Sequence, residues 1–139
     1  MTAILRFVIT LLLLAGGISR GADEGYVVIA HPGIARVDAA TLQRLYTGRA
    51  IEVAGVPVTV VNLAGGNPLR ERFLSQVVHL DNDRYVAYWT VRRHVGKGVP
   101  PRDLKSSAEV IDFVSSTPGA VGYVPATDVK AGLNVVFKP

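Results

Sequence analysis

Short apolar runs bounded by glycine and proline recur along the chain and predict the strands of a sheet. Residues 26–31 form the clearest run, which is rich in β-branched side chains and ends at Pro32 and Gly33, as expected of a central strand buried on both faces. A second run, residues 58–62, follows a small predicted hairpin with its turn at residues 54–55. Two further runs, at residues 120–124 and 133–137, bring the set to about four strands.

Apolar residues at three- and four-residue spacing separate these runs and predict four helices. The first helix covers about residues 39–47, with Asp38 as its N-cap and Gly48 as a left-handed stop. The second helix opens at Pro68, where a missing N–H costs nothing. Its apolar face consists of Leu69, Phe73 and Val77.

The third and fourth helices carry clear start signals. Short polar side chains at residues 81–83 can cap the third helix, which is expected to turn Val86 and Trp89 toward the core. Ser106 and Glu109 form a capping-box pair at the start of the fourth. Strands that alternate with helices are typical of an α/β domain, and helical crossovers favour parallel pairing, so the sequence predicts a mostly parallel sheet.

The first 21 residues read as a cleavable signal peptide. Arg6 precedes an apolar run at residues 7–15, and small residues follow it up to a cleavage point before Ala22. The run is shorter than the roughly 20 apolar residues that span a membrane, although an uncleaved anchor is the alternative. The expected division is therefore a leader, 1–21, and one exported domain, 22–139.

Composition narrows the chemistry of that domain. The chain has no cysteine, so disulfides, thiol catalysis and cysteine metal sites are excluded. His31, His79 and His94 lack metal-ligand spacing, and neither a nucleophile elbow nor a phosphate-loop lysine is present. We therefore expect a protein that is not an enzyme and that needs no metal or cofactor.

Charge is concentrated in one stretch of the chain. Without the leader, the 13 basic residues only slightly exceed the 11 acidic ones. Between residues 84 and 105, however, six basic residues face one acid, Asp103; they are Arg84, Arg92, Arg93, Lys97, Arg102 and Lys105. The stretch includes an irregular loop, residues 96–102, with two consecutive prolines. It favours an anionic ligand or partner, or it is simply a solvated surface. Nucleic acid is a poor candidate for an exported protein, so none is expected as a partner.

The turn before the second helix is the main candidate site. Gly65 and Gly66 permit close approach, and the N–H groups at the helix start, including that of Leu69, attract an oxyanion. Arg70 could clamp such an anion with two parallel hydrogen bonds. Asn67 would compete for the same donors as an N-cap, and an ordinary helix start is the alternative explanation.

Four segments, in order, resemble the type 2 periplasmic binding proteins of phosphate ABC transporters, in their second lobe. The segments are Asp38-Ala-Ala-Thr-Leu-Gln-Arg-Leu-Tyr-Thr-Gly-Arg49, Val58-Thr-Val-Val-Asn-Leu63, the turn and helix from Gly65 to Phe73, and Pro118-Gly-Ala-Val-Gly-Tyr-Val124. The resemblance implies a three-layer αβα single lobe with a mostly parallel sheet of about four strands. It also implies a periplasmic protein of phosphate uptake or sensing, with phosphate as ligand and an ABC transporter or membrane sensor as partner.

Two departures from that family bear on the site. The family's turn usually reads Gly-Ser-Gly-Thr-Arg, whereas residues 65–70 here contain neither hydroxyl. The opposing lobe, which completes the ligand cage in the family, has no counterpart in 118 residues, although a homodimer could rebuild an enclosed site if the protein is not a monomer.

Two further residues join the candidate list. His31 follows the first strand, where α/β sheets place ligand groups, and Tyr123 lies in the most family-like segment. Each has an alternative as a structural residue, His31 before a turn and Tyr123 in the core. Two functions therefore stay open: a weak oxyanion-binding protein, or a ligand-free module that docks on a membrane or sensory partner.

Overall fold

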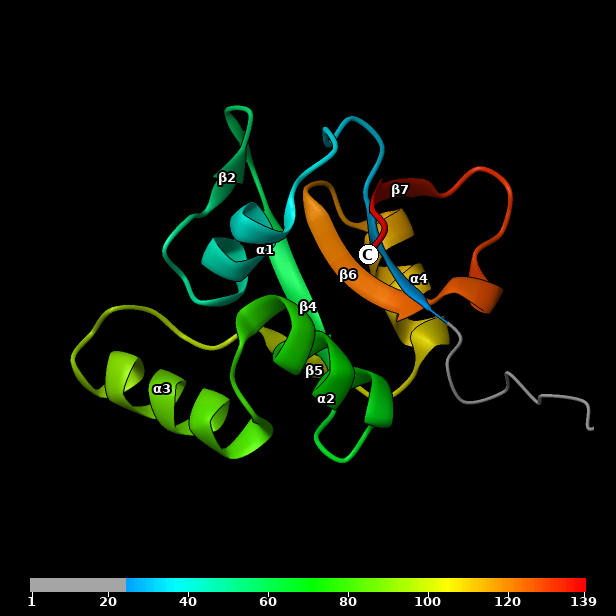
Figure 1. Cartoon of the computed structure of the whole chain (residues 1–139). Coiled ribbons are helices and arrows are strands. Elements are labelled where there is room, and N and C mark those ends of the chain that lie inside the picture. The colour runs from blue at the N-terminus through cyan, green and yellow to red at the C-terminus, as the bar shows by residue number, and fades with distance from the viewer. Residues whose placement is uncertain (1–24) are drawn as a thin grey trace, which may run out of the picture.

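The computed structural model describes residues 25–139 as an α/β domain with one central sheet (Figure 1). The predicted leader, 1–21, and the cleavage point before Ala22 lie outside the described residues. Within the described part, no helix is long and apolar enough to cross a membrane.

The central sheet has five strands, four of which run in the same direction. In spatial order they are β5 (Arg102–Leu104), β4 (Thr59–Leu63), β6 (Ala120–Pro125), β1 (Tyr26–Ala30) and β7 (Asn134–Phe137). β4 pairs in parallel with β5 and β6, whereas β1 runs antiparallel to both β6 and β7. The mostly parallel sheet is confirmed. The additional strand, β5, is short and mostly exposed, so it carries no apolar run for sequence reasoning to detect.

Helices cover both faces of this sheet, which confirms the predicted three layers. They are α1 (Ala39–Tyr46), α2 (Pro68–Phe73), α3 (Asn82–His94) and α4 (Ser107–Ser116). In Figure 1, α4 lies behind the sheet and α1 and α2 lie in front of it, while α3 stands to one side. Shorter elements are the hairpin β2 (Glu52–Val53) and β3 (Val56–Pro57), the π-helical turn η1 (Leu74–Val78) that continues α2, and the single turn η2 (Ala126–Asp128).

The predicted helix caps are confirmed. Each capping side chain accepts a hydrogen bond from a backbone N–H in the first turn of its helix: Asp38 from Thr41, Asn67 from Leu69, Asp81 from Arg84 and Ser106 from Glu109. Gly48 takes the expected left-handed conformation after α1, with φ +71°. Local chemistry therefore sets where the helices begin and how α1 ends.

The orientation of α3 differs from the prediction at one position. Trp89 is buried as expected, but Val86 is 49% exposed. Tyr85 takes the inward place instead, because residues four apart share a helix face and Tyr85 stands four residues before Trp89. α3 thus presents two aromatic side chains to the rest of the domain.

Candidate functional site

The predicted turn at the carboxyl end of β4 is open to solvent. Gly65 and Gly66 are both exposed, and a Cβ atom built at either position would meet nothing within 4 Å. Gly66 has φ +87°, a conformation that side chains rarely tolerate, so glycine is required there. The turn is closed by a hydrogen bond from the Asn67 N–H to the Ala64 carbonyl at 3.2 Å. A ligand could therefore approach this backbone closely.

The N-cap of α2 uses one of the donors that an anion would need. The Asn67 carboxamide oxygen lies 2.9 Å from the N–H of Leu69. A bound oxyanion would have to share this donor or displace the Asn67 side chain.

Arg70 points into the protein and ties four elements together. Its Nη1 donates to Asp103 Oδ1 and to the Leu63 carbonyl, and its Nε donates to Asn82 Oδ1, each at 2.9 Å. The guanidinium also lies 5.6 Å from the centre of the Tyr85 ring. Only 3% of Arg70 is exposed. The residue expected to clamp an anion at the turn is thus an internal tie between α2, β4, β5 and α3.

Tyr123 belongs to a buried hydrogen-bond network beside that tie. Its hydroxyl donates to Asn62 Oδ1 at 3.0 Å and accepts from the Leu63 N–H at 3.1 Å. The Tyr85 hydroxyl accepts from Asn62 Nδ2 at 3.2 Å and donates to the Tyr46 carbonyl at 2.7 Å. Because Tyr123 is fully buried, its hydroxyl serves this network and does not face the exposed turn.

Burial also fixes the protonation of these tyrosines. Desolvation raises the pKa of Tyr85 to about 12, and it raises the pKa of Tyr46 and Tyr123 well above the ordinary value. The three hydroxyls therefore keep their protons at neutral pH and act as donors.

His31 lies at the other end of the sheet from the turn. Its backbone N–H donates to the carbonyl of Ala120, the first residue of β6, and its Nδ1 lies 3.0 Å from the Val114 carbonyl. The expectation that His31 would join the site assumed that β1 runs with its neighbours. Since β1 is antiparallel to β6 and β4 is parallel to it, the carboxyl ends of β1 and β4 lie at opposite ends of the sheet.

Sequence reasoning missed Asn62, Asp103 and Asn82 as parts of this arrangement. Asn62 is 1% exposed and is the one amide in an apolar strand, a buried polar group that needs partners. Asp103 is the single acid in the basic stretch. Both irregularities were visible in the sequence and could have indicated a polar network.

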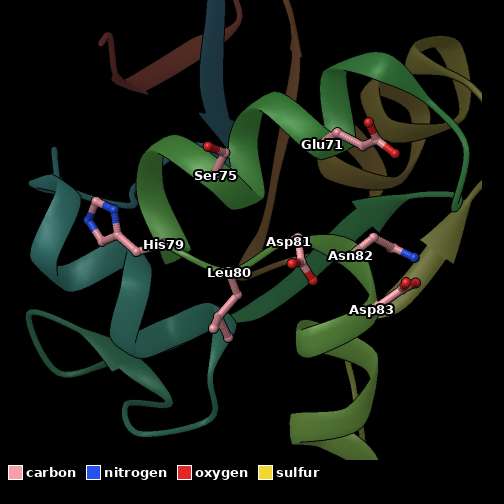
Figure 2. A pocket seen from close by; sticks show the side chains of 7 residues that line it. All are labelled: Glu71, Ser75, His79, Leu80, Asp81, Asn82 and Asp83. Carbon is pink, nitrogen blue, oxygen red and sulfur yellow. The ribbon is translucent and has the colours of Figure 1, made fainter.

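A separate hollow of about 760 Å³ lies between the helical segment 68–78 and the start of α3 and is lined by residues of both and of the link between them (Figure 2). It carries three carboxylates, those of Glu71, Asp81 and Asp83, whose charge would repel an oxyanion. Among the described residues, no group of three or more His, Asp or Glu is placed to hold a metal ion. In Figure 2 the side chains of His79 and Glu71 point in different directions, away from a common centre.

The basic stretch is partly structural. The Arg92 guanidinium lies 5.6 Å from the ring centres of both Tyr88 and Trp89 and donates to the Gly48 carbonyl at 3.3 Å. Arg93, Lys97 and Arg102 are exposed and form what we call the basic surface. Solubility, ligand attraction and partner docking are all compatible with such a surface.

No protein-family model and no curated protein matches the chain. Several solved structures share its fold, and three of them are proteins of phosphate transport. A protein described as a phosphate ABC transporter substrate-binding protein, with bound phosphate, from Clostridium perfringens has a TM-score of 0.60 at 17% identity, over 81% of this chain and 44% of that one. An ABC-type phosphate transport receptor from Vibrio cholerae has a TM-score of 0.62 at 16% identity, over 81% of this chain and 45% of that one. PstS from Borrelia burgdorferi has a TM-score of 0.58 at 15% identity, over 81% of this chain and 46% of that one.

At these identities the likeness is one of fold. It confirms the resemblance inferred from the sequence at that level, namely an α/β domain with the helix and sheet arrangement found in phosphate substrate-binding proteins. The chain spans less than half of the length of each of these proteins.

Proposed function

We propose that the protein is an exported, non-enzymatic solute-binding protein that contacts phosphate or a related oxyanion at the turn formed by Gly65, Gly66 and Asn67. The observation that carries the proposal is this exposed glycine turn at the carboxyl end of β4, in a fold shared with phosphate substrate-binding proteins. In α/β sheets, ligands bind at the carboxyl ends of strands, and helix starts attract anions.

Within this proposal the site residues have different tasks. Gly65 and Gly66 leave room for the anion, and the backbone N–H of Leu69 is a donor once the Asn67 oxygen moves aside. Arg70 is a positioning residue, because it holds the Leu63 carbonyl just before the turn. A single open turn with a competing cap fits weak binding, which suits a protein that passes phosphate to a transporter or reports it to a membrane sensor.

The proposal places the protein in the periplasm, with residues 1–21 as a cleaved leader and 22–139 as the working domain. His31 and Tyr123 have no place in this site, since one lies at the opposite edge of the sheet and the other is buried.

The test is a calorimetric titration of residues 22–139 with phosphate, sulfate and acetate, using two substitutions at one position. Asn67→Asp keeps a capping oxygen but adds a negative charge where the anion would bind, whereas Asn67→Ser caps without charge. We expect saturable heat with one oxyanion, an affinity at least about tenfold weaker in Asn67→Asp, and near-normal affinity in Asn67→Ser. Equal affinities in both variants would remove the turn as the site, and no heat with any anion would remove the function.

A specific observation supports a second function, docking on an acidic partner. Beside the basic surface, Val91, Val95 and Val99 are 58–69% exposed. Exposed apolar side chains among cations are typical of an interaction surface. Reversing the charges of Arg93 and Arg102 should then abolish recovery of a periplasmic partner; recovery of the same partner would argue against docking here.

A further inference from the structure

A pocket of about 220 Å³ lies between α3 and the segment that leads into β5. Its apolar walls are formed by Tyr85 and Trp89 from α3 and by Pro100 and Pro101 from the loop. Drug-sized ligands occupy roughly 300–1,000 Å³, so this pocket suits a smaller molecule. Flat aromatic and proline surfaces on opposite sides favour a planar apolar body.

Two arginines and one aspartate supply the charge of this pocket. The Arg93 side chain is exposed and makes no hydrogen bond or ion pair with any of residues 25–139. Arg70 uses Nε and Nη1 in its internal hydrogen bonds. Its Nη2 makes no hydrogen bond within the described chain and keeps some exposure to solvent. Asp103 accepts from Arg70 through Oδ1. The three side chains together leave one net positive charge.

The buried position of Arg70 strengthens the case for a ligand. Because only 3% of Arg70 is exposed, its guanidinium has already lost most of its hydration, so a carboxylate that reaches Nη2 meets a strong, preorganised donor. Arg93 stands on α3 at the rim and can approach the same anion from outside. Asp103 disfavours a doubly charged anion such as phosphate, because its own carboxylate shares the pocket.

We propose that this pocket binds a small monocarboxylic acid with a planar ring. The ring lies between Trp89 and the Pro100-Pro101 segment, and the carboxylate is held by Arg93 and by Nη2 of Arg70. The pocket is separate in space from the proposed oxyanion turn, because neither Gly65 nor Gly66 lines it; Arg70 holds the turn through Nη1 and faces the pocket ligand through Nη2.

Trp89 provides the readout, because it is the single tryptophan of the chain and lines the pocket. The probe is benzoate, with the neutral benzamide as an isosteric control and tryptophan fluorescence as the signal. We expect benzoate to change the fluorescence saturably and benzamide to do so far more weakly. Saturable binding of benzamide as tight as that of benzoate would overturn the proposal, as would a benzoate titration without saturation.

A matched pair of variants on α3 separates a specific contact from general charge. Arg93→Gln removes the proposed contact, and Arg84→Gln removes an exposed arginine of the same helix that does not line the pocket. We expect Arg93→Gln to weaken benzoate binding about tenfold and Arg84→Gln to leave it unchanged. Both variants should keep the wild-type circular dichroism spectrum, because both side chains are exposed. Equal weakening in the two variants would overturn the site. Addition of inorganic phosphate should leave benzoate binding unchanged, which separates this site from the turn.

Discussion

The two faces of the central sheet are built on different chemistry. On the face covered by α4, which we call the aliphatic face, Gly122 lies against the helix so closely that a Cβ there would be 2.6 Å from Val110 Cγ1 and 3.0 Å from Val61 Cγ2. On the opposite, aromatic face, Phe73 stacks on Tyr123 with ring centres 4.0 Å apart, and hydroxyls and amides fill the spaces between the rings. Close packing of aliphatic side chains dominates the first face, whereas the second also contains a buried network of side-chain hydrogen bonds.

The difference matters because buried polar groups tolerate change poorly. An apolar contact weakens in proportion to the volume removed, but an unpaired buried donor or acceptor costs its full desolvation. Asn62 has both of its amide atoms bonded to tyrosine hydroxyls, so the network that joins Asn62, Tyr85 and Tyr123 is satisfied as a unit. Substitutions and pH should therefore affect the two faces differently.

Alkaline pH should act on the aromatic face first and with the largest effect. Burial raises the pKa of Tyr85 from 10.0 to about 12, and it also raises the pKa values of Tyr46 and Tyr123. Below pH 10 these groups are protonated in both states and the stabilisation is complete. Above pH 10 the tyrosines of the unfolded chain lose their protons, whereas those of the folded domain keep them. The free energy of unfolding therefore falls as the pH rises toward the pKa in the folded state, by about 3 kcal/mol for Tyr85 alone.

Two signals would test this, tyrosine ionisation followed by ultraviolet absorbance and secondary structure followed by circular dichroism. We expect both to change together above pH 10, because Tyr46, Tyr85 and Tyr123 ionise only when the domain unfolds. Complete ionisation of all five tyrosines with an unchanged circular dichroism spectrum would contradict the buried network.

Removing Arg70 should have the next largest effect. Arg70→Ala leaves Asp103, Asn82 and the Leu63 carbonyl without their donor, and we expect a loss of about 3 kcal/mol in the free energy of unfolding, measured with urea. Arg84 is exposed and forms an ion pair with Asp81, so Arg84→Ala should cost far less. A similar loss in the two variants would show that the internal tie contributes little.

The sequence predicted most of the fold because the signals were local. Capping side chains such as Asp38 and Ser106 act within one turn, and the apolar run at residues 26–31 needs no partner to be recognised. Strand β5 was not predicted, because it is a strand through its pairing with β4 and its own polar residues carry no strand signal. The direction of β1 likewise depends on distant strands.

The candidate site was predicted only in part for the same reason. The exposed turn at Gly65 and Gly66 is local and lies where it was expected. Arg70 looked like a clamp because it follows that turn by a few residues, but its direction is set by acceptors 7 to 33 residues away. Only the folded chain brings Asp103 to Arg70.

On the aliphatic face, a single methyl group should test how close the packing is. Gly122→Ala places a Cβ against Val110, and we expect a loss of about 2 kcal/mol, measured by urea unfolding. In the double variant with Val110→Ala, the new methyl group occupies space that the valine has vacated. The double variant should be at least about 1 kcal/mol more stable than the sum of the single effects predicts. Simple additivity would mean that the two residues do not compete for the same space.

The smallest effect should come from two tyrosine hydroxyls on the aromatic face, one with hydrogen-bond partners and one without. Tyr123→Phe leaves Asn62 Oδ1 and the Leu63 N–H unpaired inside the protein, so we expect a loss of about 1–2 kcal/mol. Tyr26 is equally buried, but its hydroxyl has no hydrogen-bond partner among residues 25–139.

Tyr26→Phe should therefore leave the free energy of unfolding nearly unchanged or raise it slightly, because the variant removes a buried polar atom that gains nothing from its surroundings. Both rings pack against Phe73, and each variant keeps its ring. The ring contacts therefore do not change, and the comparison isolates the two hydroxyl groups. Equal losses for Tyr26→Phe and Tyr123→Phe would mean that burial of the ring, and not completion of the hydrogen-bond network, stabilises the aromatic face.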